Sequence, residues 1–191
     1  MSPLTELIGS AKAYGWSAVL SPSLPLSFES IATTTVGSGG SSSVSFTSIP
    51  STYTHLQIRA LGRTTGNSRR LKVQFNSDTT ATNYRQHGLY GDGSAAYAET
   101  ANNNNILYFP ESAYQANVFG VGIVDILDYT NTNKYTTLRI LHGHDDNGSG
   151  YIFLSSCLWM NTNAITSITI VPDNANIAQY SHFALYGVKG E

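Results

Sequence analysis

Charged residues are scarce in this 191-residue chain: Asp, Glu, Lys and Arg make up 12% of it, about half the usual share. The formal net charge is −2, so the chain as a whole offers no electrostatic footprint for nucleic acid. We interpret the short basic cluster Arg69–Lys72 as a solvated strand end. The polar surface must then be built mainly from Ser, Thr, Asn and Gly, which suits β-proteins that lie against neighbouring subunits.

Cysteine and long apolar runs are also lacking. Cys157 is the one cysteine, which excludes an internal disulfide, and its apolar surroundings predict a small buried core residue. No apolar run approaches the roughly 18–20 residues of a transmembrane helix, so we expect no membrane insertion. The N-terminal stretch lacks the basic region of a signal peptide, and Glu6 and Lys12 disrupt its apolar part. We therefore expect synthesis in the cytoplasm without export.

Apolar material sufficient for a core is present: 41% of the residues are hydrophobic and 11% are aromatic. A domain of this length buries roughly 70% of the surface that its unfolded chain exposes, so it needs neither disulfides nor a structural metal. We divide the sequence into an N-terminal anchoring arm, residues 1–26, and a β-sandwich domain, residues 27–191.

The arm is predicted from helical spacing and from apolar side chains that have no local core. The spacing of its first apolar residues predicts a short amphipathic helix over Pro3–Tyr14, and Gly15, Pro22 and Pro25 end regular structure. Such an arm docks on its own domain or on a neighbour, and the sequence leaves both alternatives open. The residues expected to bind the partner are Leu4, Leu7, Ile8, Tyr14, Trp16 and Leu20.

From residue 27 onward, apolar and polar residues alternate in short runs. Leu56, Ile58 and Ala60, for example, share one face of a predicted strand. The expected strands are Ser27–Val36, Ser43–Phe46, Thr54–Leu61, Arg70–Asn76, Asn83–Tyr90, Ile106–Phe109, Asn117–Leu127, Tyr135–His142, Gly150–Trp159, Thr166–Pro172 and His182–Val188. Runs of this kind predict an all-β fold, an antiparallel, jelly-roll-like β-sandwich.

Four connecting segments are predicted from turn residues. Gly37–Gly40 is a turn whose glycines can take positive φ, and Asp146–Gly150 is a tight hairpin turn. Gly62–Asn67 is expected to connect a hairpin. Gly91–Asn105 is expected to be a long polar loop, because an Asn run cannot bury apolar area.

His142, His144 and Asp145 form the sharpest chemical constellation. Two imidazoles at i and i+2 on a strand point to the same face, so both could reach one divalent ion together with the carboxylate. The alternative is a polar turn with the histidines on its flank. We favour that alternative and expect neither a metal nor a cofactor.

Catalytic motifs are not found in the sequence. There is no Gly-x-Ser-x-Gly elbow, Cys157 lies in an apolar run, and no phosphate-binding loop occurs. Asp125 and Asp128 are three residues apart at a strand end and would face opposite sides, and Glu99 and Glu111 have no fixed spacing. We expect no catalytic residues.

Carbohydrate binding has more compositional support. Twelve tyrosines and a run of asparagines supply flat apolar rings and hydrogen-bonding amides. The expected contacts are Tyr97, Asn102, Asn103, Asn104, Asn105 and Tyr108. Tyrosine is equally favoured in strands and interfaces, so burial in the core or between subunits is the preferred alternative for most of them.

Five stretches occurring in order resemble a known group of proteins. They are Phe28–Gly40, Ser48–Arg59, Val73–Asp78, Leu158–Thr162 and Phe183–Gly190. Together they resemble small structural virion proteins of tailed bacteriophages, of the minor tail, fibre or decoration type. The resemblance covers Phe28 to Gly190, leaves the arm outside it, and supplies no catalytic or ligand-binding residue.

The resemblance implies a non-enzymatic structural component of a tailed-phage virion. This would be a tail fibre, tail-tip or neck-fibre subunit, or a capsid decoration protein, anchored by its arm with polar loops facing outward. The implied partners are other virion proteins and further copies of the chain, with a trimer favoured. A carbohydrate-binding module contacting a host surface glycan is the alternative. A hydrolase has no specific support.

Overall fold

The computed structural model describes residues 27–101 and 106–190. The arm predicted over residues 1–26 lies outside the described residues. Its helix and its contact residues Leu4, Leu7, Ile8, Tyr14, Trp16 and Leu20 therefore stay predictions. The same holds for Asn102, Asn103, Asn104 and Asn105.

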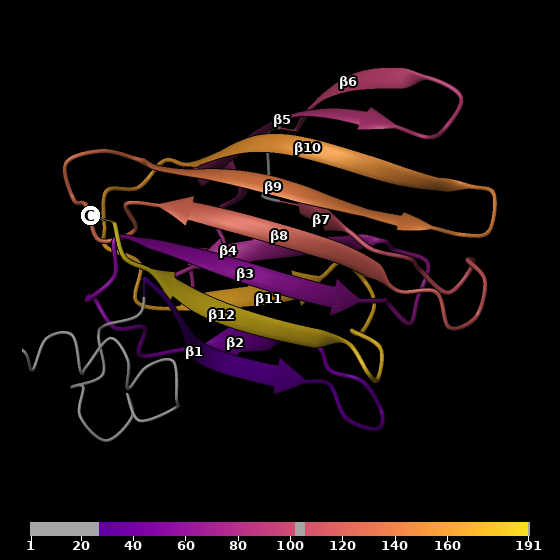
Figure 1. The fold of residues 1–191 in the computed structure, drawn as a ribbon, viewed down its shortest axis with the longest axis horizontal. Helices are drawn as coiled ribbons and strands as arrows, with labels where there is room; N and C mark the ends of the chain where they lie inside the picture. The colour runs from indigo at the N-terminus through magenta and orange to yellow at the C-terminus, as the bar shows by residue number, and fades with distance from the viewer. Residues whose placement is uncertain (1–26, 102–105, 191) are drawn as a thin grey trace, which may run out of the picture.

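The described residues form twelve strands in two antiparallel sheets (Figure 1). The large sheet has the order β1-β12-β3-β8-β9-β10-β5-β6, and the small sheet has the order β2-β11-β4-β7. The strands are β1 (Phe28–Thr35), β2 (Val44–Phe46), β3 (His55–Gly62), β4 (Arg70–Phe75), β5 (Tyr84–Gly91), β6 (Ala96–Ala101), β7 (Ile106–Tyr108), β8 (Gly120–Leu127), β9 (Thr136–Asp145), β10 (Gly150–Trp159), β11 (Ile168–Pro172) and β12 (His182–Val188).

The two sheets pack face to face, which confirms the predicted all-β antiparallel sandwich. The described part of the chain contains one helical element, the 3-10 turn Ala81–Asn83. None of its helices has the length and apolar character that crossing a membrane requires.

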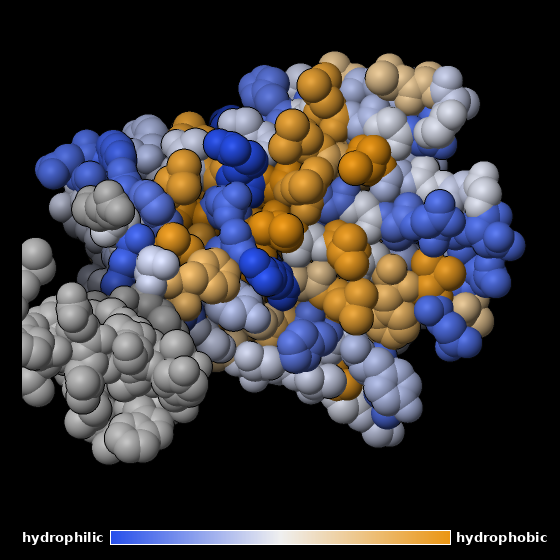
Figure 2. Space-filling view, viewed as in Figure 1, coloured by the Kyte–Doolittle hydropathy of each residue, from blue (hydrophilic) through white to orange (hydrophobic). Residues whose placement is uncertain are grey.

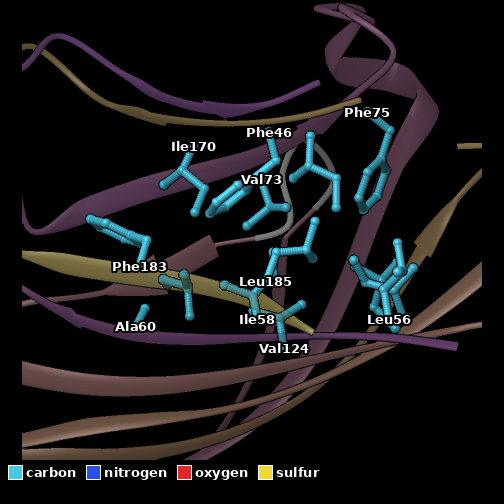
Figure 3. Close-up of a cluster of buried hydrophobic side chains, with 14 of the residues drawn as sticks. Phe46, Leu56, Ile58, Ala60, Val73, Phe75, Val124, Ile170, Phe183 and Leu185 are labelled. Atoms are coloured by element: carbon cyan, nitrogen blue, oxygen red, sulfur yellow. The ribbon is translucent and has the colours of Figure 1, made fainter. Parts of the chain in front are cut away.

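Alternating side chains fill the space between the sheets. Ile58 on β3 and Val124 on β8 point from the large sheet toward Val73 and Ile170 of the small sheet, and all four are 0–1% exposed (Figure 3). Because successive side chains of a strand point to opposite faces, each alternating run contributes half of its residues to this core. Cys157 is among them at 2% exposed, which confirms the prediction of a small core residue.

The predicted connection Gly62–Asn67 is not a hairpin. β3 lies in the large sheet between β12 and β8, whereas β4 lies in the small sheet between β11 and β7. The connection crosses from one sheet to the other, and Thr64 anchors the crossing: it is fully buried, and its N–H donates to the carbonyl of Pro110 at 2.9 Å. The alternation of β3 and β4 was compatible with either arrangement, because both strands have one buried face.

Two of the predicted turns are confirmed. Asp146 donates its N–H to the carbonyl of Ser149 at 2.6 Å, and Asn147 and Gly148 both have positive φ, so β9 and β10 form a tight hairpin. The turn after β1 has Gly39 and Gly40 at φ of 88° and 76°.

The predicted loop over Gly91–Asn105 contains a strand, β6, and that prediction was wrong. β6 pairs with β5 across a turn in which Asp92 accepts the N–H groups of Ser94 and Ala95, each at 2.9 Å. Alanine is a poor strand former, so β6 depends on its neighbour. The contact that holds β6 to β5 is the stacking of the Tyr97 ring on the Tyr90 ring, whose centroids are 4.8 Å apart.

Gly187 of β12 tests the tightness of the sandwich. A Cβ at this position would overlap the ring of Tyr53, which covers the glycine. We expect Gly187→Ala to lower the free energy of unfolding by about 1–3 kcal/mol, because the ring cannot move away without losing its own packing. Urea denaturation followed by tryptophan fluorescence measures the change. The matched control is Gly37→Ala, which has open space around it and should stay within about 0.5 kcal/mol of the parent. Equal effects of both variants would contradict the prediction.

Candidate functional site: the outer face of the large sheet

The face of the large sheet that points away from the small sheet is rich in exposed aliphatic side chains. We call it the outer face. Its central members are Leu61, Val121, Ile123, Leu141, Ile152, Leu154 and Leu89, each between 37% and 63% exposed. They gather over β3, β8, β9, β10 and β5, and Figure 2 shows the hydrophobic surface that they form together with a hydrophilic band that crosses it. A contiguous apolar patch of this kind on a folded domain marks an interaction surface.

Strand register arranges this surface in rows that run across the strands. One apolar row contains Ile123 of β8, Leu141 of β9, Leu154 of β10 and Leu89 of β5, which are successive partners. The next row along the strands contains Leu61, Val121, Gly143 and Ile152. The two rows place aliphatic side chains side by side over four to five strands.

Gly143 makes a hollow in the second row. A Cβ there would overlap the carbonyl oxygen of Tyr151, so the close approach of β9 and β10 requires glycine. Gly143 lies in a shallow depression of about 600 Å³ whose lining includes Val121, Leu141 and Ile152. The outer face therefore has both projecting aliphatic side chains and a depression that aliphatic side chains line.

The hydrophilic band is a third row, adjacent to the Ile123 row. Gln57 donates to Asp125 Oδ1 at 2.8 Å, and Arg59 Nε donates to Gln57 Oε1 at 3.0 Å. Arg139 follows Asp125 in register on β9, yet it makes no ion pair with any of the described residues. The row thus carries a carboxylate and an available guanidinium next to each other.

The structure places the three candidate metal ligands on opposite faces of β9. His142 and His144 point inward and are 2% and 9% exposed, whereas Asp145 points outward and accepts the N–H of Asn147 at 2.8 Å. The histidines lie inside the sandwich rather than on the flank of a solvated turn, because β9 continues through Asp145. Within residues 27–101 and 106–190, no group of three or more His, Cys, Asp or Glu side chains could hold a metal ion.

His142 belongs to a ladder of rings on the inner face. His142, Phe153, Tyr90 and Tyr97 are successive register partners on β9, β10, β5 and β6, with centroids 4.7, 4.8 and 4.8 Å apart. We call these four residues the ring ladder. Each such pair contributes about 0.5–1.5 kcal/mol beyond the area it buries. The ladder ties β6 to the rest of the sheet.

The expected glycan contacts are split by this arrangement. Tyr97, the last ring of the ladder, is 41% exposed. Tyr108 is 5% exposed; it stacks on Phe153 at 4.7 Å, and the guanidinium of Arg69 lies 5.3 Å from its ring centroid. Tyr108 therefore has no open ring face to offer a sugar. Arg69, expected in a solvated strand end, is half-buried over this ring.

The carboxylates considered for catalysis do not form a pair. Asp125 lies on the outer face and is bonded to Gln57. Asp128 lies beyond the end of β8 at φ 49°, where it forms an ion pair with Lys134 and accepts Asn131 N–H through its carbonyl at 2.9 Å. Asp128 therefore stabilises a turn.

Sequence reasoning missed the outer face, although a signal for it was present. The predicted strands around Val121–Leu127, Leu138–Leu141 and Ile152–Leu154 have apolar residues at consecutive positions as well as at alternate ones. Alternation identifies the buried face of a half-exposed strand, and consecutive apolar residues indicate a strand whose two faces are both apolar. The second face was therefore readable as a surface to be covered.

Burial lowers the pKa of His142 to about 4, from an ordinary value of 6.5. Its Nδ1 accepts the N–H of Tyr108 at 3.2 Å, and its buried Nε2 has no partner among the described residues. Between about pH 6.5 and pH 4, the unfolded chain binds a proton at this residue that the folded chain does not. The free energy of unfolding should therefore fall as the pH drops through this window, by at most about 3 kcal/mol.

His142→Phe tests this pH dependence. The variant should be less stable at pH 7 by about 1–3 kcal/mol, because the buried N–H of Tyr108 loses its acceptor, and its stability should fall less steeply between pH 6.5 and 4. Urea denaturation at a series of pH values measures both effects. His87→Gln, on the exposed outer face, is the control and should keep the parent's profile. A parent profile that is flat over this range would contradict the assignment.

Neither of two comparisons with known proteins found a match for this chain. No protein-family model matches the chain, and no curated protein sequence matches it either.

Proposed function

We propose that this chain is a non-enzymatic structural subunit that assembles through the outer face of its large sheet. The observation that carries the proposal is the row of aliphatic side chains at Ile123, Leu141, Leu154 and Leu89, exposed in the isolated chain. Exposing such a surface to water is unfavourable, and covering it with another protein removes that cost at roughly 25 cal/mol per Å². A subunit of an assembly has its partner permanently present.

We further propose that the assembly is the virion of a tailed bacteriophage. The chain would serve as a tail fibre, tail-tip or neck-fibre subunit, or as a capsid decoration protein, with residues 1–26 as its anchor. The resemblance of Phe28–Gly40 and Phe183–Gly190 to small virion proteins supports this place. The low charge of the chain supports it as well, because neutral polar residues can contact a neighbour without burying unpaired charges.

Host-glycan binding is the weaker proposal. Sugar sites usually offer several polar groups around an open ring face, and of the two tyrosines expected there Tyr97 alone presents one. That ring is also used structurally, since it closes the ladder that holds β6 to β5. A glycan-contacting role would therefore depend on a side chain that the fold needs for another purpose.

Mass spectrometry of purified particles of the encoding phage tests the virion proposal. We expect peptides of this chain at a fixed stoichiometry that survives gradient purification, because a structural subunit stays bound when the lysate is removed. A non-structural early protein from the same infection is the control and should disappear during purification. Presence in the lysate alone would overturn the proposal. Glycan-array binding that Tyr97→Ala abolishes would then favour the carbohydrate-binding alternative.

A further inference from the structure

The centre of the outer face has a pattern that is complementary to itself. β8 and β9 are neighbours in register, and four of their pairs point outward: Val121 with Gly143, Ile123 with Leu141, Asp125 with Arg139, and Leu127 with Thr137. Two of these pairs have members that are complementary to each other, and Ile123 and Leu141 are both aliphatic. Val121 projects while Gly143 leaves a hollow, and Asp125 is negative while Arg139 is positive.

We propose that the outer face binds a second copy of this chain about a two-fold axis that runs parallel to the strands, midway between β8 and β9. Such a rotation keeps every row at its level and reverses the order of the strands. Val121 then lies opposite the hollow at Gly143 of the second copy, and the reverse contact forms at the same time. Ile123 meets Leu141, and Asp125 meets Arg139. The inference rests on the proposed function in that it names the first partner of the assembling surface.

The flanking strands extend the match. β3 precedes β8 in the sheet and β10 follows β9, so the rotation brings β3 of one copy over β10 of the other. Leu61 then faces Ile152, and Gln57 faces Ser156. Arg59 faces Leu154, which the aliphatic part of the arginine side chain can cover while its guanidinium reaches the polar row. Apolar rows therefore meet apolar rows across four strands.

The four central strands supply a large part of the area that a stable dimer buries. β3, β8, β9 and β10 span about 20 Å across the strands, and the rows from Thr137 to Asp145 span about 25 Å along them. The flat area of this face is thus about 500 Å². A standard protein interface buries about 800 Å² per partner, so the projecting side chains and neighbouring strands and loops contribute the rest. Two sheet faces pack about 10 Å apart, and aligned packings keep the two strand directions within about 30° of each other, a condition that an axis parallel to the strands meets.

The charges favour a second copy over an unrelated partner. Arg139 has no ion pair within the described part of the chain, although Asp125 is its register neighbour. A two-fold axis between the two strands gives Arg139 of each copy one Asp125 of the other copy as its partner, so the pair forms twice in the dimer. A trimer, which the resemblance to virion proteins implied, would use two different patches on each subunit and would not need one patch to match itself.

Exchange of the two charges tests this arrangement in the full chain. Light scattering should give the parent a mass near twice 20.6 kDa. Asp125→Arg leaves only positive charges at the centre of the polar row and Arg139→Asp leaves only negative ones, so each variant alone should dissociate roughly 10–100 times more readily. Mixing the two variants should restore a dimer, since each supplies the charges that the other lacks. Circular dichroism checks that both variants are folded.

Two further variants identify the face. Val121→Asp should abolish the dimer without unfolding the chain, because the side chain is 59% exposed. The control Gln74→Arg places a charge on the outward side of the small sheet and should leave the dimer intact. A monomeric parent, a trimer, or a dimer that Val121→Asp leaves unchanged would each overturn this inference. The virion proposal fails separately, through absence of the chain from purified particles.

Discussion

The arrangement of this molecule depends on one mismatch of width: an eight-stranded sheet packs against a sheet of four strands. Neighbouring strands lie about 4.8 Å apart, so the small sheet can cover roughly half of the large one. The hydrophobic core fills the covered half. The small sheet ends at β7, which packs against β9. Part of the inner face of β10, β5 and β6 carries the stacked rings of Phe153, Tyr90 and Tyr97.

The ring ladder packs on a part of the inner face that the small sheet does not cover. Phe153 and Tyr90 stack on each other where a further strand would otherwise have to lie, and Tyr108 of β7 closes the stack from the side of the small sheet. His142 takes a place in this row because an imidazole is flat enough to stack on Phe153, at an interplanar angle of 9°. The cost is a buried ring nitrogen, which explains why its pKa falls. His142, which suggested a metal site, is therefore a packing residue whose protonation is made unfavourable by burial.

Much of the fold was predictable because it follows from local pattern. Gly150–Trp159 and His182–Val188 were predicted with the bounds that the structure has, since alternation and flanking turn residues agree there. The division of strands between the two sheets was not predictable. β3 and β4 each have one buried face whether they pair with each other or lie in opposite sheets, so their alternation carries no information on the choice. β6 was missed because its stability comes from Tyr90 on another strand.

The candidate site was less predictable than the fold, and the reason is physical. An alternating pattern identifies which residues turn inward, but a surface for assembly consists of residues that turn outward and happen to be apolar. Val121, Leu141 and Ile152 come from three strands, and the rows that they form depend on the registers of β8, β9 and β10. Tertiary pairing creates those rows. A single sequence shows which residues are apolar, but it does not show which strands lie next to each other or in which register they pair.

The polar row gives the outer face a property that apolar rows alone cannot supply. A flat aliphatic sheet face can pack against another in many registers and angles, because dispersion and hydrophobic contacts have little directional preference. Asp125 and Arg139 differ from their surroundings in this respect. Any register that covers them without a partner of opposite charge buries an uncompensated ion, which costs several kcal/mol, so the wrong registers are penalised more than the right one is rewarded. The same pair that adds little to affinity would thus select one geometry among many, and this is the requirement that an ordered assembly places on its subunits.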